Sequence, residues 1–107
     1  MVTTYQVDGW TALADPTRRI IVGRLAERPW AVGELAATLP VSRPAVSQHL
    51  KLLKDAGLVV DRAAGNRRIY QLDPAGLDAL RSELDGFWSR ALANFKQLVE
   101  DDAKEGA

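Results

Sequence analysis

The side chains with the most specific chemistry lie along one segment, residues 43–56. Within it, Val46, Leu50 and Leu53 recur at helical spacing, which predicts a helix that buries this apolar flank. The opposite flank carries side chains that bind base edges and phosphates in the major groove of DNA. Its members are Arg43, Pro44, Ser47, Gln48, Lys51 and Lys54. We therefore expect this flank to contact double-stranded DNA.

Three of these side chains suit particular DNA atoms. The forked guanidinium of Arg43 matches guanine O6 and N7 or a phosphate, and the amide of Gln48 matches adenine N6 and N7. The Ser47 hydroxyl can donate to a base edge or to a phosphate. His49 is the only histidine of the chain and neighbours the apolar flank. We expect a packed or backbone-bonded residue there, with a DNA contact as the alternative.

The charges are balanced in number, 14 basic against 14 acidic, but they are placed unevenly. Residues 41–70 carry six basic and two acidic side chains, whereas residues 71–107 carry four basic and eight acidic ones. A basic middle favours a nucleic-acid partner. When charge is the only evidence, ordinary solvated surfaces explain this distribution equally well.

The size and composition exclude several classes of function. A chain of 107 residues fits one globular domain and is too small for a Rossmann or barrel enzyme. The absence of cysteine excludes disulfides, thiol nucleophiles and cysteine-based metal sites. The carboxylates lie mainly at helix caps or on solvent-side positions, so we expect no catalytic residues, metal or cofactor. Residues 1–10 lack the features of a signal peptide and the apolar runs are short, which predicts no membrane segment and a cytoplasmic location.

Prolines and polar caps predict where the helices begin and end. Asp-Pro pairs at 15–16 and 73–74 each supply an N-cap followed by proline in the first helical turn. The first of these helices ends near Pro29 and has an apolar stripe of Ile20, Ile21, Leu25 and Ala26. A short helix then begins near Val32 and stops at Pro40. Ser42 caps the helix over 43–56, and Gly57 ends it.

Residues 58–72 predict a β-hairpin, with strands over 58–62 and 67–72 and a four-residue turn over 63–66. Arg67 and Arg68 lie beside the turn and point to opposite faces, so one of them faces DNA more fully. They also suit an edge strand, where charges discourage pairing with other sheets.

An apolar face runs along the helix that begins at Pro74. It is too long and too aromatic for one small domain to cover, although a role in the protomer's own core is the alternative. The short segment over 7–14 offers a matching apolar partner, which favours a two-fold homodimer. The predicted interface comprises Val7, Trp10, Leu13, Leu84, Phe87, Trp88, Ala91, Leu92 and Phe95. Gly76 and Gly86 weaken this helix and indicate a kink or a close helix approach.

Three motifs together carry a family resemblance: ADPTRR at a helix start, SRPAVSQHLKLLKDAGLV over the capped helix, and GNRRIYQL in the hairpin. Over roughly residues 8–100 the chain resembles the ArsR-type winged-helix repressors of bacteria, especially the autorepressor-like members without metal-binding cysteines. The resemblance implies a mainly α fold with a small β-hairpin, a winged helix-turn-helix with a long C-terminal dimerisation helix. In a single domain over 1–107, it places dimerisation helices at 7–14 and 74–100, the helix-turn-helix at 33–56 and the wing at 58–72.

Carried over by position, the family's base and phosphate contacts fall on Arg43, Pro44, Ser47 and Gln48, and its wing contacts on Arg62, Asn66, Arg67 and Arg68. Many relatives bind soft metals through a Cys-x-Cys pair, which Val32-Gly33-Glu34-Leu35 does not supply. The last helix also lacks histidine, so the family's metal effector does not transfer, and a small-molecule effector is left unassigned.

These features predict a homodimeric, sequence-specific DNA-binding repressor that acts on a pseudo-palindromic operator. Repression of its own gene is one version of this hypothesis. The alternative is a winged-helix protein-interaction module whose basic face binds an acidic partner. Ser47 and Gln48 favour DNA, because they suit base edges better than a protein patch.

Overall fold

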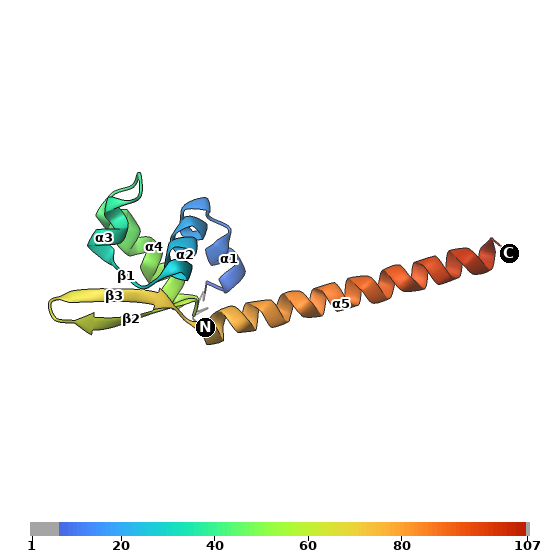
Figure 1. The fold of residues 1–107 in the computed structure, drawn as a ribbon. Helices are drawn as coiled ribbons and strands as arrows, with labels where there is room; N and C mark the ends of the chain where they lie inside the picture. The colour runs from blue at the N-terminus through green and yellow to red at the C-terminus, as the bar shows by residue number, and fades with distance from the viewer. Residues whose placement is uncertain (1–6, 107) are drawn as a thin grey trace, which may run out of the picture. The chain divides into compact units, whose positions relative to one another are not determined.

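The computed structural model describes residues 7–106, which form two compact units that meet between Leu77 and Asp78. The elements are mainly helices, with a small antiparallel sheet, and this confirms the predicted fold class. In chain order they are α1 (Gly9–Leu13), α2 (Pro16–Glu27), β1 (Trp30–Ala31), α3 (Val32–Ala37), α4 (Arg43–Asp55), β2 (Val59–Ala64), β3 (Arg67–Leu72) and α5 (Pro74–Glu105) (Figure 1).

The predicted helix starts are confirmed by their caps. The Asp15 carboxylate accepts a hydrogen bond from the Arg18 backbone N–H at 3.1 Å at the start of α2. The Ser42 hydroxyl accepts one from the Ala45 N–H at 3.3 Å at the start of α4. The Asp73 carboxylate accepts one from the Ala75 N–H at 3.1 Å, where α5 begins. These side chains satisfy backbone donors that have no partner within the helix.

The sheet has one more strand than the predicted hairpin. Its order is β1-β3-β2, and β1 pairs antiparallel with β3 through Trp30 opposite Tyr70 and Ala31 opposite Ile69. A strand of two residues is too short to show alternation, so the sequence pattern could not predict it. The indole N–H of Trp30 also donates to the Arg24 carbonyl at 3.0 Å, which ties this strand to α2.

The turn of the hairpin is shorter than predicted. Ala63 and Ala64 belong to β2 and pair with Arg68 and Arg67, so that only Gly65 and Asn66 connect the strands. Gly65 has a φ of +64°, whereas no residue other than glycine has a positive φ in the described chain. A two-residue loop with glycine first matches a type II′ turn, which fits the twist of the flanking strands.

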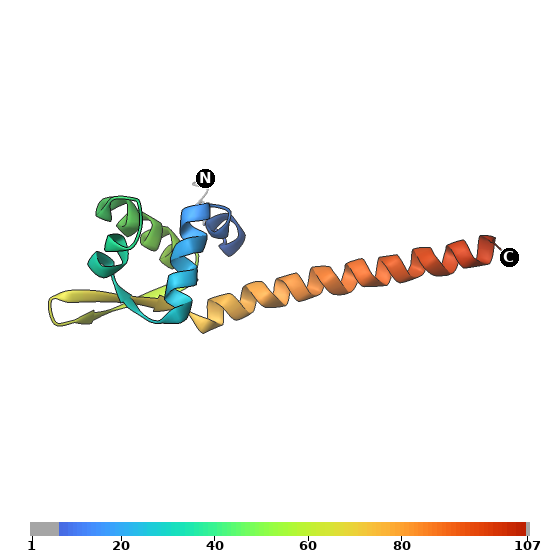
Figure 2. The ribbon, with the colours of Figure 1, turned by 45° about the horizontal axis from the view of Figure 1, so that its top comes forward.

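The first unit has its own apolar core. Helices α1 to α4 lie together on one side of the sheet, and the turn end of the hairpin projects past α3 (Figures 1 and 2). The largest fully buried side chains, which come from α2, α3, α4 and the start of the hairpin, are Ile21, Leu35, Val46, Leu50, Leu53, Leu58 and Val59. The predicted stripe on α2 is narrower than expected, because Ile20 is 50% exposed and Ala26 is also exposed.

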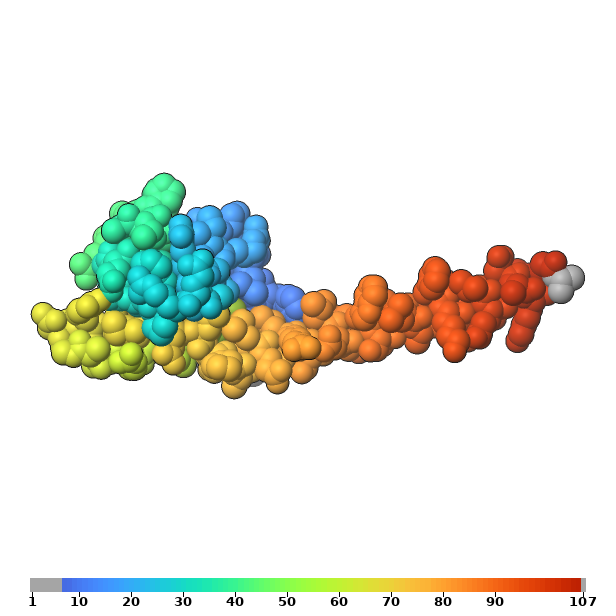
Figure 3. Space-filling model, in the orientation of Figure 1, coloured from blue at the N-terminus to red at the C-terminus, as the bar shows by residue number. Residues whose placement is uncertain are grey.

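The second unit consists of the α5 residues from Asp78 onward, and none of the side chains of α5 is buried. The helix continues past the predicted end at residue 100 to Glu105, and the Gln97 amide donates to the Asp101 carboxylate at 3.0 Å across one of its last turns. Side chains stand out along this segment in the space-filling view (Figure 3, orange to red). No helix in the described chain has an apolar stretch long enough to cross a membrane.

Candidate nucleic-acid interface

Helix α4 has one buried and one exposed flank. Val46, Leu50 and Leu53 are fully buried against the first unit, whereas Ser47 and Gln48 are exposed. Arg43, Pro44 and Lys51 are exposed as well. The apolar spacing therefore predicted the orientation of the helix correctly, and the polar flank is open to a ligand.

A nearly buried arginine joins α4 to the helices before it. The Arg18 side chain is 14% exposed, and its Nε donates to the Ala12 carbonyl of α1 at 2.7 Å. Its Nη1 lies 3.3 Å from Nδ1 of His49, on α4. Because guanidinium only donates, His49 Nδ1 accepts this hydrogen bond. His49 is half-buried and packs against Arg18, which fits the packed option of the prediction, while its hydrogen-bond partner is a side chain and not a backbone group.

The same arginine contacts the cap of its own helix. The Arg18 backbone N–H holds the pKa of the Asp15 carboxyl below its usual value, and the Arg18 charge, 3.8 Å from the carboxylate, contributes to this shift. Asp15 and Arg18 thus fix the start of α2 while Arg18 holds α4. This positions the exposed flank of α4 relative to the rest of the first unit.

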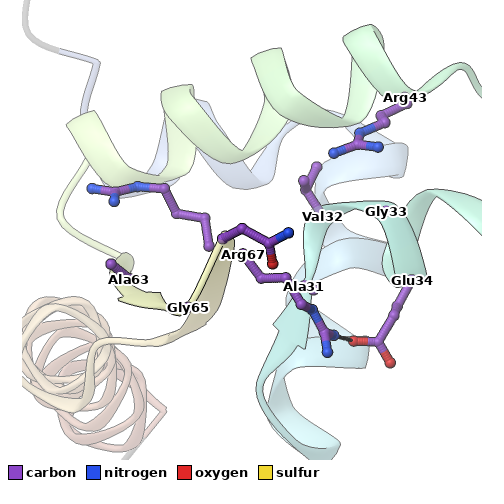
Figure 4. Close-up of a pocket in the computed structure, with 10 residues that line it drawn as sticks. Ala31, Val32, Gly33, Glu34, Arg43, Ala63, Gly65 and Arg67 are labelled. Atoms are coloured by element: carbon purple, nitrogen blue, oxygen red, sulfur yellow. Dashed lines mark hydrogen bonds and ion pairs between the residues drawn. The ribbon is translucent and has the colours of Figure 1, made fainter.

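An open hollow of about 680 Å³ lies between the start of α3, the start of α4 and the tip of the hairpin. It is lined by Ala31, Val32, Gly33, Glu34, Arg43, Ala63, Gly65, Asn66, Arg67 and Arg68. Three of these are arginines and one is a glutamate (Figure 4). We call this set the cationic hollow.

The predicted cations differ in whether they have a protein partner. Within residues 7–106, Arg43 and Arg62 form no ion pair, and both are exposed. Lys51 Nζ lies 3.6 Å from the Asp55 carboxylate on the same helix. Arg67 is ion-paired with Glu34 of α3 (Figure 4). The hollow therefore offers one arginine without an ion pair, Arg43, and two that are paired, Arg67 and Arg68.

Arg68 turns to a different partner. Its Nε lies 2.8 Å from the Asp61 carboxylate on β2, and the other oxygen of Asp61 lies 2.8 Å from Lys54 Nζ on α4. The Asp61 side chain is only 7% exposed. The hydrogen bond from Lys54 holds its pKa below the usual value, and Arg68 adds to this effect. Asp61 thus links the hairpin to α4.

The predicted dimer residues lie on exposed or half-exposed positions. Trp10 of α1 is 39% exposed, and Val7 and Leu13 are half-buried. On α5 the exposed members are Leu84, Phe87, Trp88, Ala91, Leu92 and Phe95. No cluster of three or more metal-ligating side chains occurs in the part of the chain that the structure describes.

Comparisons with known proteins connect this geometry to a family. The profile of a family described as a helix-turn-helix domain matches residues 13–62. The HTH-type transcriptional regulator Rv2034 of Mycobacterium tuberculosis is 66% identical over 96 residues, which cover 90% of each chain. A crystal structure of a possible transcriptional regulator for arsenical resistance has a TM-score of 0.71 and 44% identity, over 82% of this chain and 96% of that one.

A further neighbour is an ArsR-like transcriptional regulator from Rhodococcus sp. RHA1, with a TM-score of 0.71, 35% identity and coverage of 86% of this chain and 87% of that one. The chain belongs to the ArsR family. It is a winged helix-turn-helix regulator of transcription, and DNA binding is favoured over the protein-interaction alternative. The predicted helix-turn-helix, residues 33–56, corresponds to α3 and α4, and the predicted wing, residues 58–72, corresponds to β2 and β3.

Sequence reasoning missed the residues that hold this ArsR-family surface together. Sequence patterns did not single out Arg18, Glu34 or Asp61. Each of them contacts a residue of another helix or strand, and such a contact has no signature in the local sequence. Their partners become visible only when α3, α4 and the wing are brought together.

Proposed function

We propose that this ArsR-family regulator is a homodimeric repressor that binds a pseudo-palindromic operator through α4 and the wing. The observation that carries this proposal is the exposed flank of α4, where Ser47 and Gln48 follow Arg43, the residue of α4 that lines the cationic hollow. The opposite flank is buried, so the helix can enter the major groove without losing its packing. Occupation of the promoter by the dimer then blocks transcription.

Base contacts and phosphate contacts come from different parts of this surface. Arg43, Pro44, Ser47 and Gln48 lie at the start and along the exposed flank of α4, where they face the base edges in our proposal. Lys51, Arg62, Asn66, Arg67 and Arg68 are exposed polar or cationic groups that suit the backbone. No catalytic step or cofactor is part of the proposal, and we place the protein in the cytoplasm, where bacterial DNA lies.

The proposed dimer joins two copies through the apolar face of α5 and the segment over 7–14. The proposal requires the two α4 helices of the dimer to lie about 34 Å apart, the spacing of successive major grooves. Each half of the operator then meets an equivalent surface. Because autorepression is common in the group that the chain resembles, the DNA upstream of its own gene is the first operator to test.

The test starts with a footprint on that upstream DNA, followed by gel shifts on the protected duplex and on a scrambled duplex. We expect Gln48→Ala to weaken binding to the protected duplex by about 1–3 kcal/mol and to reduce its preference over the scrambled one. Arg62→Ala is expected to weaken binding to both duplexes alike, because a phosphate contact carries no sequence information. Lys96→Ala, which removes a positive charge on α5, is the matched control.

The salt dependence supplies an independent measure. If each dimer neutralises about 6–10 phosphates, log K falls against log salt with a slope of roughly −5 to −9. Absence of a protected region and of any binding at low salt would contradict the proposal. Equal losses of sequence preference in Gln48→Ala and Arg62→Ala would contradict the division of labour between α4 and the wing.

A further inference from the structure

Glu34 is the one acidic side chain among the residues that line the cationic hollow. Its neighbours there include Arg43, Arg67 and Arg68. A carboxylate at this place opposes the approach of a DNA phosphate, since like charges repel. A surface built only for affinity would carry a neutral or basic residue in its place.

The Glu34 carboxylate is bound on both oxygens. Arg67 of the wing is ion-paired with Oε1, and Nη2 of Arg28 lies 3.9 Å from Oε2. Arg28 is itself held in place, because its guanidinium lies 3.4 Å from the centre of the Trp30 ring and its Nη1 donates to the Pro29 carbonyl at 2.9 Å. Glu34 therefore has a second cationic partner if Arg67 leaves it.

The pair between Glu34 and Arg67 is exchangeable. Their side chains are 45% and 54% exposed, and ion pairs at such exposed positions contribute little to stability. A phosphate offers arginine two oxygens at once and is a strong competitor for the guanidinium. Arg68, in contrast, is bound to the nearly buried Asp61, which Lys54 also holds. Of the two wing arginines that line the hollow, Arg67 is thus the one free to change partner.

We propose that Glu34 competes with a DNA backbone phosphate for Arg67 and so limits the sequence-independent part of DNA binding. The inference rests on the proposed function, because it assigns the cationic hollow to the DNA backbone. Without DNA, the Glu34 carboxylate neutralises Arg67. On DNA, the Arg67 guanidinium moves to a phosphate, and Arg28 compensates the charge of the released carboxylate.

The test compares Glu34→Gln with the wild-type protein on the footprinted duplex and on the scrambled duplex. Glutamine keeps the size of the side chain and removes its charge. We expect binding to both duplexes to tighten by about two- to five-fold at low salt, in line with the strength of an exposed ion pair. The gain is expected to shrink as salt rises, because screening weakens the competition.

Two further variants make the test specific to this contact. Glu100→Gln causes the same change in net charge on α5, outside the residues that line the hollow, and is expected to leave both affinities unchanged. In an Arg67→Ala background, Glu34→Gln is expected to have a clearly smaller effect, because the arginine for which Glu34 competes is absent and only the direct repulsion between carboxylate and phosphate is left. Thermal unfolding of each variant checks that the fold is retained.

The outcomes separate this inference from the proposed function. Wild-type protein that binds neither duplex overturns both. If the wild type binds but Glu34→Gln binds equally or more weakly, Glu34 positions Arg67 for DNA and the competition is wrong. A gain that is equally large in the Arg67→Ala background, or that Glu100→Gln reproduces, also overturns it.

Discussion

The two units of this protein carry the same kind of sequence signal with opposite structural outcomes. In α4, apolar residues at helical spacing, Val46, Leu50 and Leu53, are fully buried by the first unit. In α5, Phe87 and Trp88 belong to a stripe of the same periodicity, yet they are 54% and 64% exposed. Periodicity therefore shows that a face suits burial, but it does not identify the partner that buries it.

The two apolar faces differ in burial because the two units contain different numbers of helices and strands. Helix α4 packs within a unit where helices and a sheet meet around common side chains, whereas the second unit is one helix. A single helix has no second surface on which to place its apolar face. A contiguous exposed apolar surface is typical of a protein interface. This is why we assign the face of α5 to a second copy of the chain.

The largest expected effect is the loss of the proposed dimer when this face is made polar. Trp88→Ser combined with Phe95→Ser is expected to convert the proposed dimer into a monomer, because buried aromatic anchors contribute about 2 kcal/mol or more each to association. Sedimentation velocity measures the change, and DNA affinity is expected to fall with it. The matched control is Ile20→Ser, which alters a half-exposed apolar residue of the first unit. A double variant that sediments like the wild type would show that another surface joins the copies.

A smaller effect is expected where α5 begins, inside the first unit. A Cβ added at Gly76 would lie 1.7 Å from the Gly57 carbonyl oxygen, just after α4. Gly76→Ala is therefore expected to displace this turn and to lower the free energy of unfolding by about 1–3 kcal/mol. Urea titration followed by circular dichroism measures it. This contact confirms the close approach that Gly76 indicated.

Gly23→Ala is the matched control for that substitution. Apart from its two chain neighbours and the adjacent backbone of α2 itself, nothing in the described chain lies within 4 Å of a Cβ placed at Gly23. Alanine is expected to raise the free energy of unfolding there by about 0.5–1 kcal/mol, through its higher helix propensity. If both alanine variants are stabilised, the contact between Gly76 and Gly57 does not constrain the fold.

The smallest expected effect concerns the carboxylate that fastens the wing to α4. Asp61→Asn is expected to lower the free energy of unfolding by about 1–2 kcal/mol at neutral pH, because it loses charge-assisted hydrogen bonds with Lys54 and Arg68. Since these contacts lower the pKa of Asp61, its contribution is present above the ordinary pKa of 3.8 and is lost as the pH falls through the lowered value. The difference between variant and wild type should therefore shrink in acid.

The corresponding pair of the second unit provides the comparison. Asp85 lies 4.0 Å from Arg81, and both side chains are more than two-thirds exposed, at 71% and 80%. Asp85→Asn is expected to change the free energy of unfolding by less than about 0.5 kcal/mol at any pH. A difference for Asp61→Asn that is equally small, or that does not vary with pH, would show that its partners in the first unit do not stabilise the charge.

Local signals predicted the parts of the fold that depend on neighbouring residues. Helix α4 was defined by the cap at Ser42, the glycine at position 57 and the apolar spacing between them. Gly57 has a φ of +80°, as a glycine that ends a helix commonly does. Tertiary contacts decided the rest. Strand β1 exists only because Trp30 and Ala31 meet β3, and the two-residue turn follows from the full pairing of Ala64 with Arg67.

The candidate site divides in the same way. The sequence alone determined which side chains α4 exposes, because capping and periodicity act within a few residues. Only the tertiary structure decided that Arg67 faces Glu34, 33 positions away, and that Asp61 lies between Lys54 and Arg68. Ion pairs across elements depend on the distance between charges in space. That distance is set by packing and has no counterpart in the spacing of residues along the chain.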